Sequence, residues 1–237
     1  MPKFTIDGTT DPFVRVKLEQ GEKISAERDA MAAMTDTISL GGKARGGVFK
    51  SLARAVTTGE SFFMQEITAE KGPGSVMLSP RHPGEVHLVE LNNDEWMLSD
   101  GSFLASDESL ALETVRQKSI GTALVGGTGG FFQLKVSGTG TLAVSGVGAV
   151  REMKVEPGSE LIVDSGHAVA WPASLSSKAS LSTGQGGGFL KKAVGAAKSG
   201  EGIVLRFSGG AEGGKVLVSS RSRPSFIGWI SEGLPSK

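Results

Sequence analysis

The chain has no cysteine and no tyrosine among its 237 residues. The absence of cysteine excludes disulfide bonds, thiolate nucleophiles and cysteine metal ligands. Lysine and arginine together number 25, and aspartate and glutamate also number 25, so the formal net charge is zero. A neutral chain has no overall field that would draw it to nucleic acid or to anionic lipid.

Long apolar runs are also missing. No segment approaches the roughly 20 consecutive apolar residues that a membrane-spanning helix needs. Residues 1–8 (MPKFTIDG) lack the basic and apolar regions of a secretion signal, so the sequence predicts a cytoplasmic protein. Attachment to the surface of a membrane is compatible with all of these features.

What the chain does contain is glycine, at 35 residues, and enough apolar side chain, at 38%, to bury a core. The glycines follow no collagen-like period, which suits a fold with many tight turns. A chain of this length forms one large all-β domain or a few small units that share cores.

The strongest positive feature is a pattern that occurs three times, with a period of about 70 residues. Each copy has an apolar strand, a turn, a second strand that ends in alanine, a glycine-rich loop and a β-hairpin. In the first copy, residues 13–18 (FVRVKL) alternate apolar and polar side chains, which indicates a half-buried strand. The first strands centre on Leu18, Leu91 and Val155, and the second strands end near Ala32, Ala105 and Ala170.

Turn residues mark the hairpins and the ends of the strands. We expect hairpin turns at Gly72-Pro73-Gly74 and Gly138-Thr139-Gly140, and a further turn at Asn92-Asn93-Asp94. The hairpin strands begin at 62–63, 131–132 and 203–204, and they return through 76–78, 142–144 and 216–218. The pattern predicts an all-β fold of three units related by pseudo-threefold symmetry, at residues 1–80, 81–146 and 147–237.

Copies one and three contain an insertion that copy two lacks. Residues 46–56 (GGVFKSLARAV) and 186–197 (GGGFLKKAVGAA) carry apolar residues at helical spacing, which predicts two short amphipathic helices. Helices this short must dock on another surface. The candidate contacts to a membrane or a partner protein are Phe49, Lys50, Arg54, Phe189, Lys191 and Lys192. Alternatively, the apolar faces of these helices pack inside the assembly itself.

The remaining large apolar residues are assigned to packing or to the C-terminus. Residues 226–230 (FIGWI) predict a short helix or hook. Trp96 and Trp171 lie on predicted strands, so we interpret them as core or interface residues rather than as the walls of a ligand cleft.

Several short motifs together resemble a known family. They are residues 59–63 (GESFF), residues 102–105 (SFLA) and the Gly-x-Gly hairpin turns, in this order and spacing. The chain is similar, from about residue 10 to residue 230, to bacterial relatives of the mitochondrial biogenesis ("altered inheritance of mitochondria") proteins.

The resemblance implies three units like that of the tryptophan RNA-binding attenuation protein (TRAP), each a short double-stranded β-helix. It also implies a homotrimer, in which three chains form a ring of nine units. Mitochondrial relatives are associated with inner-membrane organisation, which implies a location peripheral to the inner membrane. A closed ring is physically reasonable because it removes exposed sheet edges.

No catalytic set emerges from the sequence. The three histidines, His82, His87 and His167, lack the His-x-His spacing of a metal-binding β-helix, so we predict no metal site and no cofactor. Residues 164–167 (DSGH) are too close in sequence to align as a catalytic triad and are interpreted as a tight turn. The sequence has no Gly-x-Ser-x-Gly elbow. We therefore expect a protein that is not an enzyme.

Nucleic-acid and phosphate binding are also disfavoured. The glycine cluster at 126–130 lacks the lysine and hydroxyl residue that complete a phosphate loop. The cluster at 186–188 precedes Lys191 and Lys192, and a hinge before a docked helix explains it better than an anion site. Basic residues do not recur at equivalent places in the three copies, as an RNA-binding ring requires.

The sequence therefore predicts a non-catalytic scaffold or binding protein that contacts an unknown partner, a protein or a membrane, through its ring faces and inserted helices. The alternative is a sensor that binds a small ligand or nucleic acid in clefts between neighbouring units.

Overall fold

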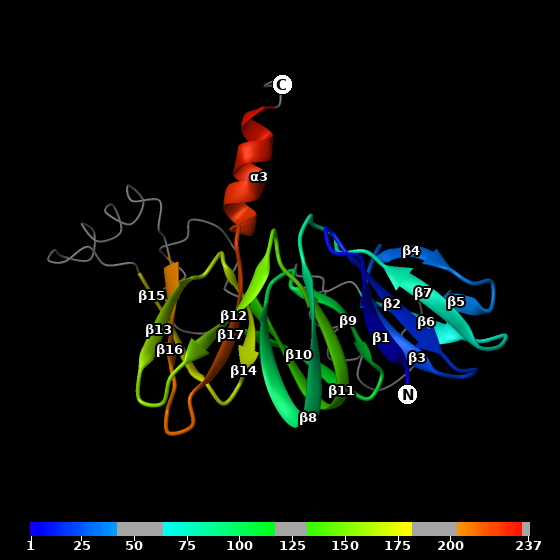
Figure 1. Ribbon diagram of the computed structural model, residues 1–237, viewed down its shortest axis with the longest axis horizontal. Helices are drawn as coiled ribbons and strands as arrows, with labels where there is room; N and C mark the ends of the chain where they lie inside the picture. Colours follow the sequence, from blue (N-terminus) through cyan, green and yellow to red (C-terminus); the bar gives the residue numbers. More distant parts are fainter. Residues whose placement is uncertain (42–63, 117–131, 182–202, 234–237) are drawn as a thin grey trace, which may run out of the picture.

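The computed structural model describes residues 1–41, 64–116, 132–181 and 203–233. These residues form seventeen β-strands and one helix, which confirms the all-β prediction (Figure 1). The first strands of the chain lie at one end of the long axis of the molecule, and the last strands lie towards the other end. The helix projects from the strands near the middle of that axis.

The first part of the chain forms seven strands whose pairing is antiparallel throughout. They are β1 (Lys3–Asp7), β2 (Phe13–Leu18), β3 (Lys23–Glu27), β4 (Met31–Met34), β5 (Ile38–Gly41), β6 (Met64–Ala69) and β7 (Gly74–Leu78). β7 lies between β2 and β4, while β6 lies between β3 and β5. β1 covers the remaining edge of β2.

The second part uses four strands, two of which are long. They are β8 (Val86–Ser99), β9 (Phe103–Asp107), β10 (Ala111–Arg116) and β11 (Phe132–Ser145). β8 and β11 pair along their whole length. β9 pairs with the last third of β11, and β10 pairs with its first half.

The third part returns to short strands and ends in the helix. Its elements are β12 (Val150–Val155), β13 (Glu160–Asp164), β14 (Ala168–Pro172), β15 (Ser176–Leu181), β16 (Ile203–Ser208), β17 (Gly214–Ser219) and α3 (Arg223–Glu232). β17 lies between β12 and β14, while β16 lies between β13 and β15.

Two turns expected in the second part are absent, and this corrects the sequence analysis. Asn93 is an extra residue in β8, opposite the step from Gly138 to Thr139 in β11. Its φ is 60°, and Gly138 has φ 126°, so both strands continue through a bulge and do not reverse. The turn residues therefore bend a long ribbon here. In contrast, the turn at Gly72-Pro73-Gly74 joins β6 to β7 as predicted.

The predicted first strands coincide with β2, with the first half of β8 and with β12, whereas β3 was not predicted as a separate strand. Ile24 and Ala26 of β3 are fully buried. This five-residue strand has only two apolar side chains facing the core, which is too short a pattern to separate from the neighbouring turn. The predicted C-terminal helix is present as α3.

One sheet connects all three parts of the chain. Its strand order is β12-β17-β14-β8-β11-β9-β3-β6-β5, with β10 also paired to β11. Three clusters of buried apolar residues lie behind the strands, and two of them cross between parts. Ala105 of β9 belongs to the cluster of the first part, and Ala170 of β14 belongs to that of the second.

The buried and exposed tryptophans provide a test of the fold. Trp171 is fully buried and meets Phe207 edge to face, with ring centroids 5.1 Å apart. Trp171→Ala should lower the unfolding free energy by about 3–5 kcal/mol, because it leaves a large cavity. Trp229→Ala, on exposed α3, should change it by less than about 0.5 kcal/mol. Urea unfolding measures both, and equal losses would contradict this core assignment.

Candidate functional site

The six contact residues predicted from the sequence lie outside the described residues, as does the glycine cluster at 126–130. They are Phe49, Lys50, Arg54, Phe189, Lys191 and Lys192. The candidate surfaces below are therefore built from the described strands, their connections and α3.

Two of the three histidines make separate local contacts, and His82 Nε2 has no hydrogen-bond partner among the described residues. His87 Nε2 lies 3.4 Å from the Glu152 carboxylate, and His167 Nδ1–H donates to the Ser219 carbonyl at 2.8 Å. Burial lowers the pKa of the His82 and His87 imidazoles. Among the described residues, no three side chains of metal-ligand type come together.

Residues 164–167 form the predicted tight turn at the end of β13. The Asp164 carboxylate accepts the Gly166 N–H at 2.8 Å, and the His167 N–H donates to the Asp164 carbonyl at 2.9 Å. The carboxylate thus holds the backbone of its own turn, as aspartate commonly does. This geometry explains the Asp-Ser-Gly-His motif without catalysis.

The connections between the three parts of the chain meet and bond to one another. Gly84, before β8, bridges in parallel to Gly148, before β12. The Glu85 N–H donates to the Gly148 carbonyl at 2.8 Å, and the Gly148 N–H donates to the Pro83 carbonyl at 3.0 Å. Both glycines have positive φ, which lets the two connections approach closely.

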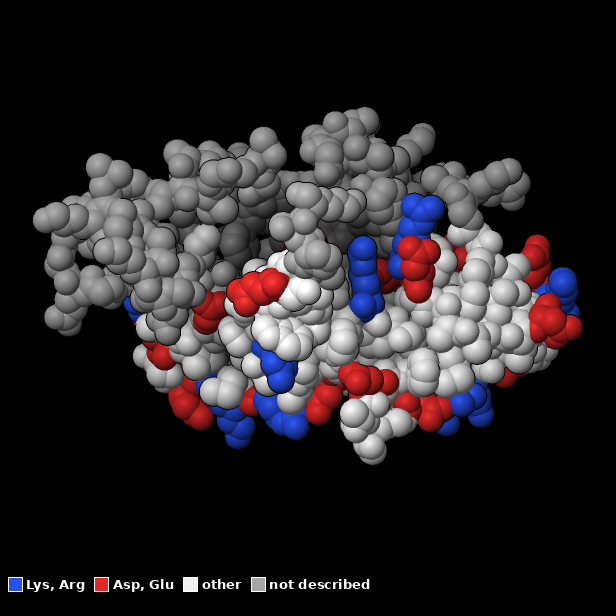
Figure 2. Space-filling view, turned by 90° about the horizontal axis from the view of Figure 1, so that it is seen from above, with Lys and Arg blue, Asp and Glu red and all other residues white. Residues whose placement is uncertain are grey.

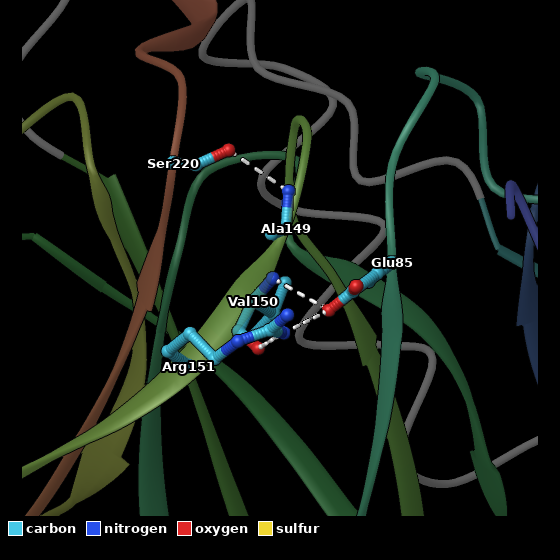
Figure 3. A network of polar contacts seen from close by, with 5 residues as sticks. All are labelled: Glu85, Ala149, Val150, Arg151 and Ser220. Atoms are coloured by element: carbon cyan, nitrogen blue, oxygen red, sulfur yellow. Dashed lines mark hydrogen bonds and ion pairs between the residues drawn. The ribbon is translucent and has the colours of Figure 1, made fainter. Parts of the chain in front are cut away.

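Side chains strengthen this junction (Figure 3). The Glu85 carboxylate accepts the Val150 N–H at 2.9 Å and pairs with the Arg151 guanidinium. Both contacts lower the pKa of the Glu85 carboxyl, and the hydrogen bond from the Val150 N–H has the larger effect. Ser220, after β17, accepts the Ala149 N–H at 2.9 Å. Polar contacts thus join the entry of β8, the entry of β12 and the exit of β17.

A cavity of about 290 Å³ lies beside the junction. Thr9, Thr10 and Asp11 line it from the turn between β1 and β2, while Arg221 and Phe226 line it from the C-terminal side. Glu85 of the junction also lines the cavity, which thus offers hydroxyls, two carboxylates, one guanidinium and an aromatic ring. Such a lining suits a small polar ligand. The cavity volume lies at the lower end of the usual range for ligand-binding sites.

The helix α3 stands away from the strands and has no buried residue (Figure 1). Its apolar residues Phe226, Ile227, Trp229 and Ile230 fall within about 160° of the helical circumference. Ile227, Trp229 and Ile230 are exposed, Trp229 to 67%. At its base, Arg223 lies 3.2 Å from the Asp100 carboxylate. Among the described residues, no helix is long and apolar enough to cross a membrane.

Basic and acidic side chains are mixed on the described part of one face of the molecule (Figure 2). Figure 2 shows basic and acidic side chains side by side along the visible rim, without a broad patch of one sign on the described part of this face. Ion pairs such as Lys135 with Glu95, at 2.8 Å, account for part of this mixing.

Sequence reasoning missed Glu85, the key residue of the junction, and Asp107, which is 3% exposed. The Asp107 carboxylate accepts the Thr141 N–H at 2.6 Å, and its Oδ1 has no hydrogen-bond partner among the described residues. Burial raises the pKa of the Asp107 carboxyl, and the Thr141 bond opposes that shift. Gly84 directly before Glu85 was a signal for a tight connection, but no local pattern announces Asp107.

Comparison with known proteins supports the resemblance seen in the sequence. Residues 4–221 match the family model described as mitochondrial biogenesis AIM24. An uncharacterised protein of Streptococcus pyogenes serotype M6 is 31% identical over 241 residues, which cover 99% of this chain and 92% of that protein. The crystal structure of a Streptococcus pyogenes protein, 28% identical, matches 99% of this chain and 100% of its own with a TM-score of 0.78.

The burial of Asp107 predicts how the stability of the protein depends on pH. Its raised pKa means that the native state loses stability as pH rises from about 4, the unfolded pKa, through the native pKa. Asp107→Asn keeps an oxygen for the Thr141 N–H and removes the buried charge. It should therefore raise the unfolding free energy at pH 7 by about 1 kcal/mol and have little effect near pH 3.5.

Urea unfolding at the two pH values measures this difference. Glu113→Gln is the matched control, because Glu113 is an exposed carboxylate on the adjacent strand β10. Equal stabilisation of Asp107→Asn at both pH values would contradict the assigned cost of the buried charge.

Proposed function

Since this chain belongs to the mitochondrial biogenesis AIM24 family, we propose that it is a non-catalytic scaffold protein. It consists of three pseudo-equivalent TRAP-like β-units, and three chains form a homotrimeric ring of nine units. The ring faces and α3 contact a partner, which is another protein or a membrane surface. The proposed location is cytoplasmic and peripheral to the inner membrane.

One observation supports the three-unit proposal: the same scheme of strand pairing recurs in each part of the chain. In the first part, β7 joins β2 to β4, and β6 joins β3 to β5. In the third part, β17 joins β12 to β14, and β16 joins β13 to β15. The two halves of β8 and of β11 make the same four pairings with each other and with β9 and β10. Six strand positions thus recur in 1–80, 81–146 and 147–237.

A scaffold role fits the way in which polar side chains are used. The Asp164 carboxylate closes a turn, Glu85 holds two connections together, and Asp107 anchors the bulged ribbon. Each of these three carboxylates accepts a hydrogen bond from a backbone N–H. Function then rests on surfaces, and among the described residues α3 groups three exposed large apolar side chains, Ile227, Trp229 and Ile230.

A ring would present α3 three times on one face, because rotation about the ring axis keeps every copy facing the same way. Three weak apolar contacts on a common face bind much more tightly than one. The mixed surface charge and the neutral chain do not favour nucleic acid as this partner.

The cavity at the junction favours one alternative, a small-ligand sensor. It lies between connections of different units and carries both Asp11 and Arg221. A sensor of this kind would bind a small ligand with paired charges there. The nucleic-acid form of this alternative has no comparable support among the described residues.

Native mass spectrometry of the gently purified protein tests the ring and separates the two functions. We expect a mass of three times 24.5 kDa with no adduct, as a scaffold requires. A trimer with a discrete small adduct would favour the sensor. A monomer at micromolar concentration would contradict the ring.

Removal of the exposed tryptophan tests α3 as the contact surface. Trp229→Ala should reduce flotation with phosphatidylcholine vesicles about tenfold, since burial of a large apolar side chain contributes about 1.5–3 kcal/mol. Phe49→Asp and Phe189→Asp test the sequence-predicted helices in the same assay, with the trimer retained. Met153→Ala, at an exposed site on β12, is the control.

Failure of the unmodified protein to float would assign the contact to a protein partner. Loss of the trimer in both phenylalanine variants would instead make the inserted segments part of the assembly. Equal flotation of Trp229→Ala and Met153→Ala would remove α3 as the membrane contact.

A further inference from the structure

The three parts of the chain are joined by one kind of strand pair. β3 pairs with β9, and the end of β8 pairs with β14, both antiparallel. β9 and β14 hold the same position in their parts, since each is the edge partner of the returning strand, β11 or β17. β3 and the end of β8 also correspond, because they pair with β6 and with the first half of β11.

The two joints also share one register. At the first joint, Ala26, the fourth residue of β3, lies opposite Ala105, the third residue of β9. At the second joint, Leu98, the fourth of the last five residues of β8, lies opposite Ala170, the third residue of β14. All four side chains are fully buried.

One strand of each kind is left without such a partner. β4 corresponds to β9 and β14, because it is the edge partner of β7. β13 corresponds to β3, because it pairs with β16 as β3 pairs with β6. Within the described residues, β4 pairs only with β7, and β13 pairs only with β16.

β4 and β13 are more exposed than the strands to which they correspond. Every residue of β9 is buried, and β14 is buried at four of five residues, whereas β4 is exposed at three of four. Met34 of β4 is 40% exposed, while Trp171, at the corresponding position of β14, is fully buried. Ile162 of β13 is 50% exposed, while Met97, at the corresponding position of β8, is half-buried. Apolar edge strands of this kind invite pairing with another chain.

The buried clusters agree with this assignment. The first cluster is completed by Leu104 and Ala105 of β9, and the second by Val169 and Ala170 of β14. The third cluster has no such contribution among the described residues. The corresponding residues are Ala32 and Ala33 of β4, and both are exposed.

We infer that β13 of one copy pairs with β4 of a second copy in the register of the two internal joints. Val163 then lies opposite Ala33, and Ile162 lies opposite Met34. The partner is a second copy of this chain, and the contact is head-to-tail, so each copy uses β4 on one side and β13 on the other. This inference rests on the proposed ring, which such a contact closes when its rotation matches that of the internal joints.

One electrostatic feature opposes the pairing and is compensated. The same register brings Glu160 towards Asp36, two residues of like charge. Arg206 lies 3.0 Å from the Glu160 carboxylate and supplies the neutralising charge at that end of the joint. The apolar pair in the middle of the joint is unaffected.

The absence of native cysteine allows a direct test by disulfide cross-linking. Opposed residues of an antiparallel pair have Cβ atoms about 4.5–5.5 Å apart, close to disulfide geometry. The double variant Met34→Cys, Ile162→Cys replaces two exposed side chains. Mild oxidation should convert most of it into covalent oligomers that end at a closed trimer on non-reducing gels.

The matched control is Ala33→Cys with Ile162→Cys, which places one thiol on the opposite face of β4. Its cross-linked fraction should be at least about tenfold lower. The single variants should give no covalent oligomer, because a head-to-tail contact keeps the two copies of one residue apart. Hydrogen exchange of the unmodified protein adds a measurement without substitutions: amides of Met31–Met34 should be protected in the assembly.

The outcomes separate the inference from the proposed function. A trimer by native mass spectrometry that does not cross-link through residues 34 and 162 would overturn the inference and leave the ring. Equal cross-linking of the double variant and its control would overturn the register in the same way. A monomer without cross-links would overturn both.

Discussion

The structure depends on the pairing of strand edges. An unpaired edge exposes a row of N–H and C=O groups, so each short strand must find a partner on both sides or be covered. This chain meets the constraint by passing an edge strand from each part to the one before it, as β9 does for β3 and β14 does for β8. The same strands complete the buried clusters, so backbone pairing and core formation are solved by one contact.

This shared use explains why the parts do not form separate domains with cores of their own. Ala105 and Ala170 are small enough to let the joined strands pack closely, and both are buried in the cluster of the preceding part. The connections are tied together at a second place, where Gly84 meets Gly148 and Glu85 binds the Val150 N–H. Sheet pairing on one side and this junction on the other hold neighbouring parts against each other.

The sequence predicted the strands that carry long apolar alternation, such as β2, and the turns marked by proline and glycine, such as residues 72–74. It could not predict β3, whose two core residues leave too little pattern, nor the ribbon of β8 and β11. Asn93 and Gly138 have the chemistry of turn residues, and only pairing across the ribbon decides that they form a bulge. Glu85 and Asp107 were missed for the same reason, since their partners lie 65 and 34 residues away.

The surfaces left exposed differ in kind, and this difference bears on function. In the part of the chain that the structure describes, β4 and β13 expose both apolar side chains and an unpaired backbone edge, and a further strand would satisfy both. The backbone of α3 is hydrogen-bonded within the helix, so its exposed face needs apolar contact alone. A lipid surface or a groove on another protein supplies that contact without a matching strand. Assembly and partner contact can therefore use different parts of this molecule, so that assembly through β4 and β13 would leave α3 available to a partner.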